Sequence, residues 1–286
     1  MPNDDTIEEK RVYSDKAGKV EVFVASELGV VAVDVSGDRV GEFGLAHRCT
    51  ARAIAAEGER VAVATDEDVD LAVGDEEFEP TGFGPAVAVG FHDGDLLAAN
   101  EDGWVARYDP ERADEVDLTD LDAADADAAE KLAWQTLGHV ETVRAIDGPL
   151  VAAADGVYRV GDGDLSHAGL DDVRDVAGRG VPLAATGESL YTLGNGWMDV
   201  LDGVFRSVSG DGFERAHAIA GTTVYAKVDD EWQEADLPTD DPVVDVAYAP
   251  GAVFAVTEAG TLLVDAGDGW QTQVLGVRGV AGLAVR

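Results

Sequence analysis

The sequence predicts an all-β fold built from repeated antiparallel sheets, and three features of the chain point to it. Segments of about four to seven residues alternate between apolar and polar side chains or run apolar, as β-strands do. Tight-turn dipeptides such as Asp-Gly and Asn-Gly separate these segments and favour short hairpins. The strand pattern returns about every 30–40 residues, which is typical of a repeat architecture.

The clearest repeat lies in the middle of the chain. It has four predicted strands joined by three tight turns, at residues 143–146, 149–154, 157–160 and 164–167. Residues 181–197 then match residues 149–165 nearly position by position. One unit is therefore a four-stranded antiparallel meander.

Placed along the chain, this unit begins near Ala51, Ala86, Val143, Val173, Phe205, Val244 and Val277. The last unit ends after one strand, whereas residues 20–25, 29–35 and 39–43 supply a second, third and fourth strand with no first strand before them. A C-terminal strand that completes an N-terminal sheet would close a ring and remove its free edges. The chain thus resembles a seven-bladed β-propeller of four-stranded blades, closed by pairing of its C-terminal strand with the N-terminal blade. It also resembles haloarchaeal propeller proteins of unassigned function.

Two segments interrupt the repeats. Residues 1–19 are expected to form a charged arm before a single propeller domain at residues 20–286. Residues 109–139 form an insertion whose apolar spacing predicts a helix that starts near Asp120. This insertion carries Leu132, Trp134 and Leu137, which would anchor another protein if exposed. The alternative is that the insertion folds back and covers an edge of its own propeller.

The charge of the chain indicates its solvent and limits its partners. The 286 residues include 58 Asp and Glu but 20 Lys and Arg, a formal charge of −38 spread along the whole sequence. Such a surface is typical of halophiles, because concentrated salt screens its self-repulsion, although a surface evolved for a basic partner is an alternative. Direct nucleic-acid binding is disfavoured. One cysteine and no long apolar run favour a cytoplasmic protein without disulfides or membrane segments.

The most specific signal is a column of arginines at the start of the predicted innermost strands. Alignment of the units places five arginines in it, Arg52, Arg144, Arg174, Arg206 and Arg278, and leaves Val87 and Asp245 as exceptions. Innermost strands line the central channel of a propeller, so these guanidiniums would surround one mouth. Because like charges repel, anionic groups must lie between them.

Two kinds of anion could fill that role. The turns between second and third strands carry acids on the same rim, namely Glu27, Asp66, Glu101, Asp155, Glu188 and Glu258, which would form internal ion pairs. The equivalent turn of the Phe205 unit lacks an acid, which leaves Arg206 without an obvious partner. The other candidate is a bound phosphate, nucleotide, acidic metabolite or acidic segment of a partner protein, for which arginine offers forked donors.

Signatures of enzymes are weak. The five histidines are scattered, and neither a metal site nor a cofactor motif is expected. Cys49 would act as a nucleophile only beside a base, and a small buried thiol is the favoured interpretation. We therefore interpret the chain as a non-enzymatic platform for binding or assembling proteins, which uses the arginine-lined mouth. The alternative is a binding site or enzyme for a small phosphorylated or carboxylated anion, with Asp245 as base. Cations around Asp245 would lower its pKa and weaken it as a base. A third, purely architectural interpretation makes the arginines locks between blades.

Overall fold

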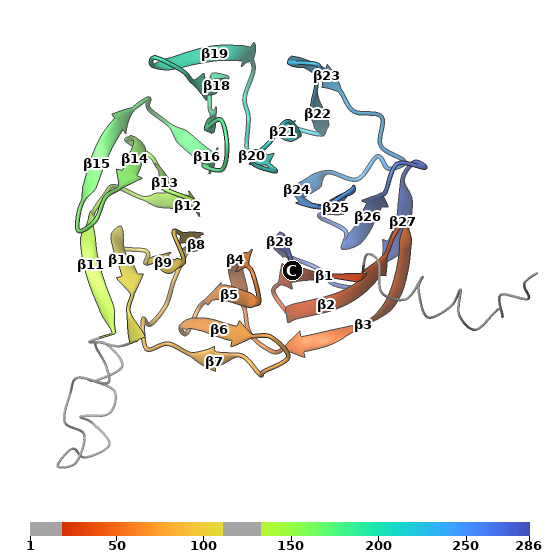
Figure 1. Ribbon diagram of the computed structural model, residues 1–286, viewed down its shortest axis with the longest axis horizontal. Helices are drawn as coiled ribbons and strands as arrows, with labels where there is room; N and C mark the ends of the chain where they lie inside the picture. Colours follow the sequence, from red (N-terminus) through yellow and green to blue (C-terminus); the bar gives the residue numbers. More distant parts are fainter. Residues whose placement is uncertain (1–18, 111–132) are drawn as a thin grey trace, which may run out of the picture.

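The computed structural model describes residues 19–110 and 133–286, and in these residues seven antiparallel sheets are arranged as blades around a central axis (Figure 1). Each blade has four strands, and the first strand named below for each blade is innermost. Blade 1 consists of β28 (Val280–Val285), β1 (Lys19–Ser26), β2 (Gly29–Ser36) and β3 (Arg39–His47). Blade 2 consists of β4 (Ala51–Glu57), β5 (Arg60–Thr65), β6 (Val69–Val73) and β7 (Glu79–Pro80).

The other five blades follow in chain order. Blade 3 consists of β8 (Ala88–His92), β9 (Asp95–Ala99), β10 (Trp104–Tyr108) and β11 (Trp134–His139). Blade 4 consists of β12 (Val143–Asp147), β13 (Leu150–Ala153), β14 (Gly156–Val160) and β15 (Leu165–Gly169). Blade 5 consists of β16 (Val173–Ala177), β17 (Leu183–Thr186), β18 (Ser189–Leu193) and β19 (Trp197–Asp202). Blade 6 consists of β20 (Ser207–Gly210), β21 (Ala216–Ala220), β22 (Thr223–Val228) and β23 (Glu231–Glu234). Blade 7 consists of β24 (Val243–Ala249), β25 (Ala252–Thr257), β26 (Thr261–Asp265) and β27 (Gln271–Val274).

The predicted closure of the ring is confirmed. Strand β28 pairs antiparallel with β1, with Val285 opposite Val22 and Leu283 opposite Val24. The pairing continues beyond β28, because the backbone groups of Arg286 and Glu21 exchange hydrogen bonds of 2.9 and 3.1 Å. The two ends of the ring are therefore joined by backbone hydrogen bonds, which leaves no free edge at this seam.

The core lies between neighbouring blades. Because both faces of a blade are covered by its neighbours, its middle strands are mainly apolar, as in β13 and in residues 61–64 of β5. Between blades 7 and 1, for example, the fully buried Val33 and Phe254 belong to one apolar cluster. Alanines such as Ala62 and Ala64 are also fully buried, and their small side chains let adjacent sheets approach closely. This packing holds the innermost strands in fixed positions around the axis.

The structure corrects the interpretation of the insertion. Residues Trp134–His139 form β11, the outermost strand of blade 3. The indole N–H of Trp134 donates to the carbonyl of Thr81 at 3.1 Å, and its ring packs 4.7 Å from that of Phe83. Leu137 is buried in the core. The anchor required both side chains to be exposed, whereas Trp134 and Leu137 pack against their own propeller, in agreement with the alternative that the insertion folds back.

Other expectations about the interruptions lie outside the described residues. These are Leu132, the helix expected from Asp120 and the charged arm up to residue 18. Across residues 19–110 and 133–286, no helix has the length and apolar character needed to cross a membrane.

Candidate functional site

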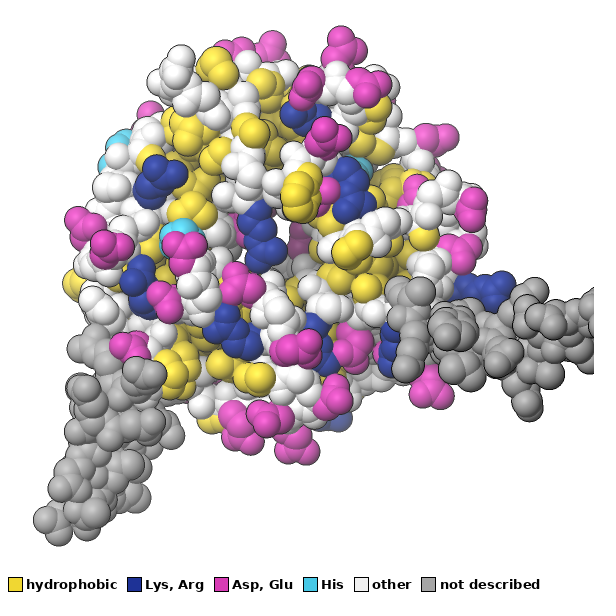
Figure 2. All heavy atoms as spheres, in the orientation of Figure 1, with side chains coloured by type: hydrophobic (Ala, Val, Ile, Leu, Met, Phe, Trp, Pro, Cys, Tyr) yellow, Lys and Arg dark blue, Asp and Glu magenta, His cyan; other side chains and the backbone are white. Residues whose placement is uncertain are grey.

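A channel runs along the axis of the ring and forms a cavity of about 620 Å³. Its wall comes from the innermost strands β4, β8, β12, β16, β20, β24 and β28. Figure 2 shows the hollow at the centre of one face, with charged and hydrophobic side chains around it. The starts of these strands lie at one mouth of the channel and their ends lie at the other, so residues at equivalent strand positions form rings around the axis.

Four of the predicted arginines occupy equivalent positions at the mouth where the innermost strands begin. Arg52, Arg144 and Arg174 each sit at a β-bulge, since the pairing register skips one residue there. Such a bulge leaves its extra residue outside the ladder and re-aims its side chain. Arg206 directly precedes β20, and all four side chains line the channel. We call these four residues the arginine ring.

The pairing register shows that Asp245 and Arg278 do not occupy the column position at which the sequence alignment placed them. The position equivalent to the arginines is Val244 in blade 7, because Asp245 follows the bulge and pairs with Val256. In blade 1 the equivalent residue is Ala281, since Gly282 pairs with Ala25 and Val280 with Ser26. Arg278 therefore lies before β28 and is exposed. The sequence alignment placed both residues wrongly because it matched residue types and did not account for the bulges.

Three of the ring arginines connect their own blade to the next one. Arg52 contacts Glu101 at 2.7 Å, Arg144 contacts Asp172 at 2.7 Å, and Arg206 contacts Glu258 at 3.2 Å. Each guanidinium also donates to a backbone carbonyl of the following blade, those of Ala86, Val173 and Val243 respectively. Because these side chains remain about 31% exposed, each ion pair adds at most about 1 kcal/mol to stability.

Arg174 differs from the other three. Its ion pair is with Asp172 at 3.4 Å, in the loop before its own blade, and Arg144 holds the same carboxylate more closely. The hydrogen bond from Arg144 is the main reason why the pKa of Asp172 is lowered. No carbonyl bond to the next blade is formed by Arg174 among the described residues, and its side chain is 35% exposed. Its guanidinium therefore has donors left for another anion.

The predicted internal partners are only partly those observed. Glu101 and Glu258 do pair with ring arginines, but they reach an arginine of the preceding blade. For this reason Arg206 has a partner although its own blade lacks an acid at that turn. Asp172, which sequence reasoning missed, lies in the loop between β15 and β16 and pairs with two arginines. Asp155, another predicted partner, instead accepts a hydrogen bond from the hydroxyl of Tyr158.

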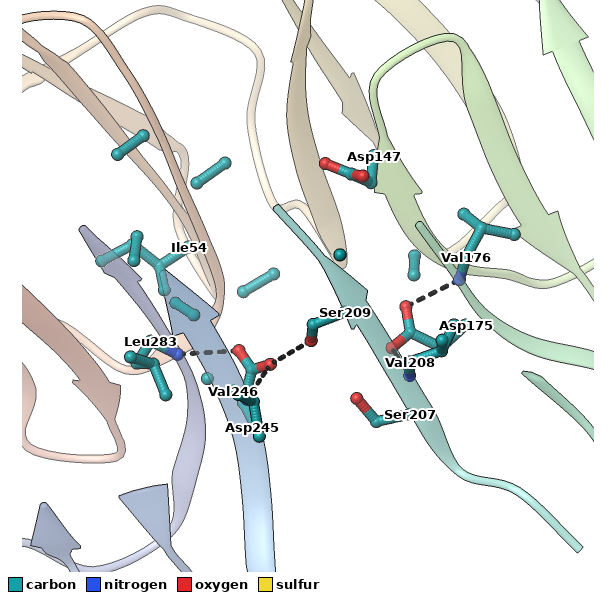
Figure 3. A pocket seen from close by; sticks show the side chains of 18 of the residues that line it. Ile54, Asp147, Asp175, Val176, Ser207, Val208, Ser209, Asp245, Val246 and Leu283 are labelled. Carbon is teal, nitrogen blue, oxygen red and sulfur yellow. Dashed lines mark hydrogen bonds between the residues drawn. The ribbon is translucent and has the colours of Figure 1, made fainter. Parts of the chain in front are cut away.

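Behind the arginine ring, one side of the channel wall carries carboxylates (Figure 3). Asp175 accepts hydrogen bonds from the backbone amides of Val176 and Val208, both at 2.9 Å. Asp245 accepts from the amides of Val246 and Leu283, at 2.7 and 3.0 Å, and from Ser209 at 3.3 Å. An innermost strand is an edge strand, so its channel-facing amides lack a ladder partner. The carboxylates meet this need and connect adjacent blades.

Burial is the strongest influence on the pKa values of Asp175 and Asp245. It raises the pKa of Asp175 to about 7, although the amide hydrogen bonds act in the opposite direction. It also raises the pKa of Asp245. The expectation that neighbouring cations lower the pKa of Asp245 is therefore wrong. Asp245 uses both carboxylate oxygens to hold backbone amides, and this is the arrangement of a structural group.

The mouth at the ends of the innermost strands has a different set of charges. Arg215 contacts Asp211 at 2.7 Å and donates to the carbonyls of Ala249 and Ala252, both at 3.0 Å. Nearby, Nδ1 of His217 lies 2.8 Å from the hydroxyl of Tyr248. Burial lowers the pKa of His217 to about 4 and raises that of Tyr248, so both groups are neutral at pH 7. This hydrogen bond connects β21 with β24 beside the channel lining.

The described residues contain no group of three or more His, Cys, Asp or Glu side chains placed to hold a metal ion. Several histidines have local partners. His47, for instance, lies 2.8 Å from Asp70, and His167 lies 3.1 Å from the carbonyl of Asp155. Burial raises the pKa of the Cys49 thiol to about 11, which makes it a poor nucleophile near neutral pH. The geometry of the channel thus offers hydrogen bonds and charges for binding.

Comparison with known proteins agrees with this architecture. A family model described as "Beta-prop_HVO_0234:-like, beta propeller" matches residues 6–286. No curated protein shows significant sequence similarity to the chain.

Several solved structures share the fold at low sequence identity. The crystal structure of the computationally designed Ika8 protein is 15% identical, with a TM-score of 0.57, and the match covers 92% of this chain and 86% of that one. A structure titled as YCF48 bound to D1 peptide is 15% identical, with a TM-score of 0.55, and covers 80% and 82%. Apo AztD from Citrobacter koseri is 11% identical, with a TM-score of 0.52, and covers 94% and 98%. At these identities the likeness concerns the fold alone.

Proposed function

Because the chain belongs to the HVO_0234-like β-propeller family, we propose that it is a non-enzymatic binding platform that holds an acidic segment of a partner protein at its arginine ring. The observation that carries this proposal is the state of Arg174. Its guanidinium lies at the channel mouth, is 35% exposed, and shares one carboxylate with Arg144. Arginine binds carboxylates through two parallel N–H donors, so an acidic side chain of a partner can complete its hydrogen bonding.

The interior of the channel favours a segment that lies across the mouth over a small anion that enters. Asp175 and Asp245 line the channel directly behind the arginine ring. A phosphate or dicarboxylate that moved inward would meet these carboxylates, which repel it once they are ionised. A protein segment that lies over the mouth avoids them and can reach arginines of several blades. The structure titled as YCF48 bound to D1 peptide supports the view that this fold can carry a peptide.

The composition supports a halophile cytoplasm as the working environment. With a formal charge of −38, the chain would repel an acidic partner at long range in dilute salt. In molar salt the screening length falls to about 3 Å, so only groups in direct contact interact strongly. Forked hydrogen bonds to Arg174 and its neighbours are contacts of this kind. We therefore propose that binding at the ring depends on hydrogen-bond geometry more than on net charge.

The test measures binding of a fluorescein-labelled hexaglutamate peptide by anisotropy in about 2 M KCl. Arg174→Ala is expected to weaken binding at least about tenfold, or about 1.4 kcal/mol. Arg159→Ala is the matched control, since it removes the same charge from an exposed residue of β14 outside the channel lining. Equal binding by wild type and Arg174→Ala would refute the proposal.

Two further measurements separate the alternatives. Arg52→Ala is expected to lower stability by about 1 kcal/mol, because it removes a contact between blades. If Arg174→Ala costs as much stability and leaves binding intact, the ring is purely structural. Succinate and inorganic phosphate are then titrated as small anions. Saturable stabilisation by either one, lost in Arg174→Ala and without peptide binding, would favour a small-anion site.

A further inference from the structure

A second pocket of about 440 Å³ opens between blades 5 and 6. Its apolar lining comes from the loop before β17, from β17 itself, from β19, from the loop between β20 and β21, and from β23. These residues are Val181, Leu183, Val200, Leu201, Phe213 and Trp232. Arg179, Gly210, Phe213 and Arg215 line both this pocket and the channel, so the two cavities meet at the channel mouth opposite the arginine ring. We call this cavity the interblade pocket.

Three of the six apolar side chains of the interblade pocket are exposed to solvent. Phe213 is 88% exposed, Val181 is 56% exposed and Val200 is 38% exposed. On the face shown in Figure 2, hydrophobic side chains lie among charged ones over β18, β19 and β22. Apolar side chains that converge on a pocket of this size are typical of ligand sites, whose volumes are about 300–1,000 Å³. An apolar group seated here would cover them and gain their burial free energy.

Two cations of the lining, Lys227 and Arg179, retain donors for an anionic group beside the contacts that they already make. Arg215 is committed to Asp211 and to two backbone carbonyls. Lys227, in contrast, pairs with Asp230, whose side chain is 94% exposed, so that pair competes with water. Arg179 is 47% exposed, and its Nε lies 3.8 Å from Asp147.

The backbone holds Arg179 in place between two glycines. A Cβ on Gly178 would lie 2.2 Å from the carbonyl oxygen of Asp147, and one on Gly180 would lie 2.4 Å from that of Gly212. Gly180 also has a φ of +71°, in the left-handed region that favours glycine. The loop is therefore wedged between its neighbours in blades 4 and 6. From this fixed position Arg179 reaches across the channel mouth to the carbonyl of Ala56 in blade 2, at 3.3 Å.

We propose that the interblade pocket binds an amphipathic carboxylate, with an aromatic or branched aliphatic body. The body packs against Val181, Phe213 and Trp232, and the carboxylate bonds to Arg179 and Lys227. Glu214, Asp230 and Glu231 also line the pocket. They make it selective for a single negative charge, because a more highly charged anion would meet their repulsion. The same chemistry is offered by a small carboxylic acid and by the C-terminal residue of a peptide.

Displacement of 1-anilinonaphthalene-8-sulfonate, an aromatic anion that fluoresces in apolar sites, tests this proposal in about 2 M KCl. The competitors are 4-phenylbutyrate, its neutral amide, and the peptide acetyl-Gly-Gly-Phe with a free or amidated C-terminus. We expect the carboxylate of each pair to displace the dye at least about tenfold better than the amide. A preference for 4-phenylbutyrate over the free peptide would identify a small acid as the ligand, and the reverse would identify a peptide end. Equal displacement by acids and amides would overturn the proposal.

Variants of the lining give an independent check. Arg179→Ala is expected to weaken the binding of 4-phenylbutyrate at least about tenfold and to remove the preference for the acid over the amide. Phe213→Ser is expected to weaken the binding of the acid and of the amide equally. Because Phe213 is 88% exposed, this variant should fold normally. Arg159→Ala, an exposed arginine outside both cavities, is the control for lost charge. Unchanged affinity in both Arg179→Ala and Phe213→Ser would refute the assignment.

Discussion

Replacement of Asp175 by asparagine is expected to change how the stability of the propeller depends on pH. In the folded protein, burial raises the pKa of Asp175 from 3.8 to about 7. Between these values the unfolded chain has lost the proton while the folded protein retains it. The stabilising contribution is therefore complete below pH 3.8 and is lost as the pH rises through about 7. Asparagine cannot ionise, so the variant lacks this loss.

The shift sets the size of the effect. About three pKa units correspond to about 4 kcal/mol over the whole window, and linkage places about 2–3 kcal/mol of this between pH 5 and pH 8. The amides of Val176 and Val208 bond to different oxygens of Asp175, and asparagine replaces one of these oxygens with an NH2 group, which only donates, so one amide loses its acceptor. This costs about 1–3 kcal/mol at every pH. The variant is thus expected to be less stable than wild type at pH 5. The difference in unfolding free energy should shift in favour of the variant as the pH rises.

The assay is urea unfolding followed by tryptophan fluorescence at pH 5, 6, 7 and 8, in about 2 M KCl. The quantity compared is the difference in unfolding free energy between wild type and variant, because the many surface carboxylates affect both proteins equally. Asp162→Asn, at an exposed position, is the control and is expected to run parallel to wild type. A difference between wild type and Asp175→Asn that stays constant from pH 5 to pH 8 would refute the reasoning.

Three other predictions concern single side chains. Trp134→Ala should lower the unfolding free energy by about 2–4 kcal/mol, measured by urea unfolding, because it removes ring packing and the bond to Thr81; a neutral result would contradict the assignment of β11. His217→Gln should abolish a loss of stability, up to about 3 kcal/mol, that wild type undergoes as the pH falls from 6.5 towards 4. As the pH falls, His217 of the unfolded chain is protonated before that of the folded protein. Identical pH profiles of wild type and His217→Gln would contradict this prediction. Cys49 should react slowly with iodoacetamide at pH 8 until urea unfolds the protein, because its thiol pKa is about 11.

The blades could be predicted from the sequence because their determinants are local. In blade 4, tight turns and alternating side chains specify each hairpin within a few residues, and β12 to β15 follow the expected order. Closure of the ring by β28 was also predictable, because an incomplete first blade and a surplus last strand complement each other. Strand β11 was missed, since it follows a long interruption and has no turn signal before it.

The candidate site was less accessible to sequence reasoning. A bulge shifts register by one residue without a signature of its own, so Asp245 was aligned with the arginines although Val244 holds that position. Contacts between blades were missed for another reason. The amides that Asp175 and Asp245 satisfy belong to Val208 and Leu283, whose distance along the chain hides them from any local pattern. A polar residue at a channel-facing position of an apolar strand was the signal that could have found these carboxylates.

The seam between β28 and β1 also affects the order in which the protein can assemble during translation. Strand β1 is synthesised well before its inner partner, which consists of residues 280–285. While the intervening blades are being made, the edge of β1 stays available to any other extended chain. Ring closure is therefore a late step. A chain that ends before residue 280 would keep the edge of β1 unpaired and would be prone to aggregation. Chaperone dependence should accordingly be greatest for nascent chains that carry six blades and lack the last strand.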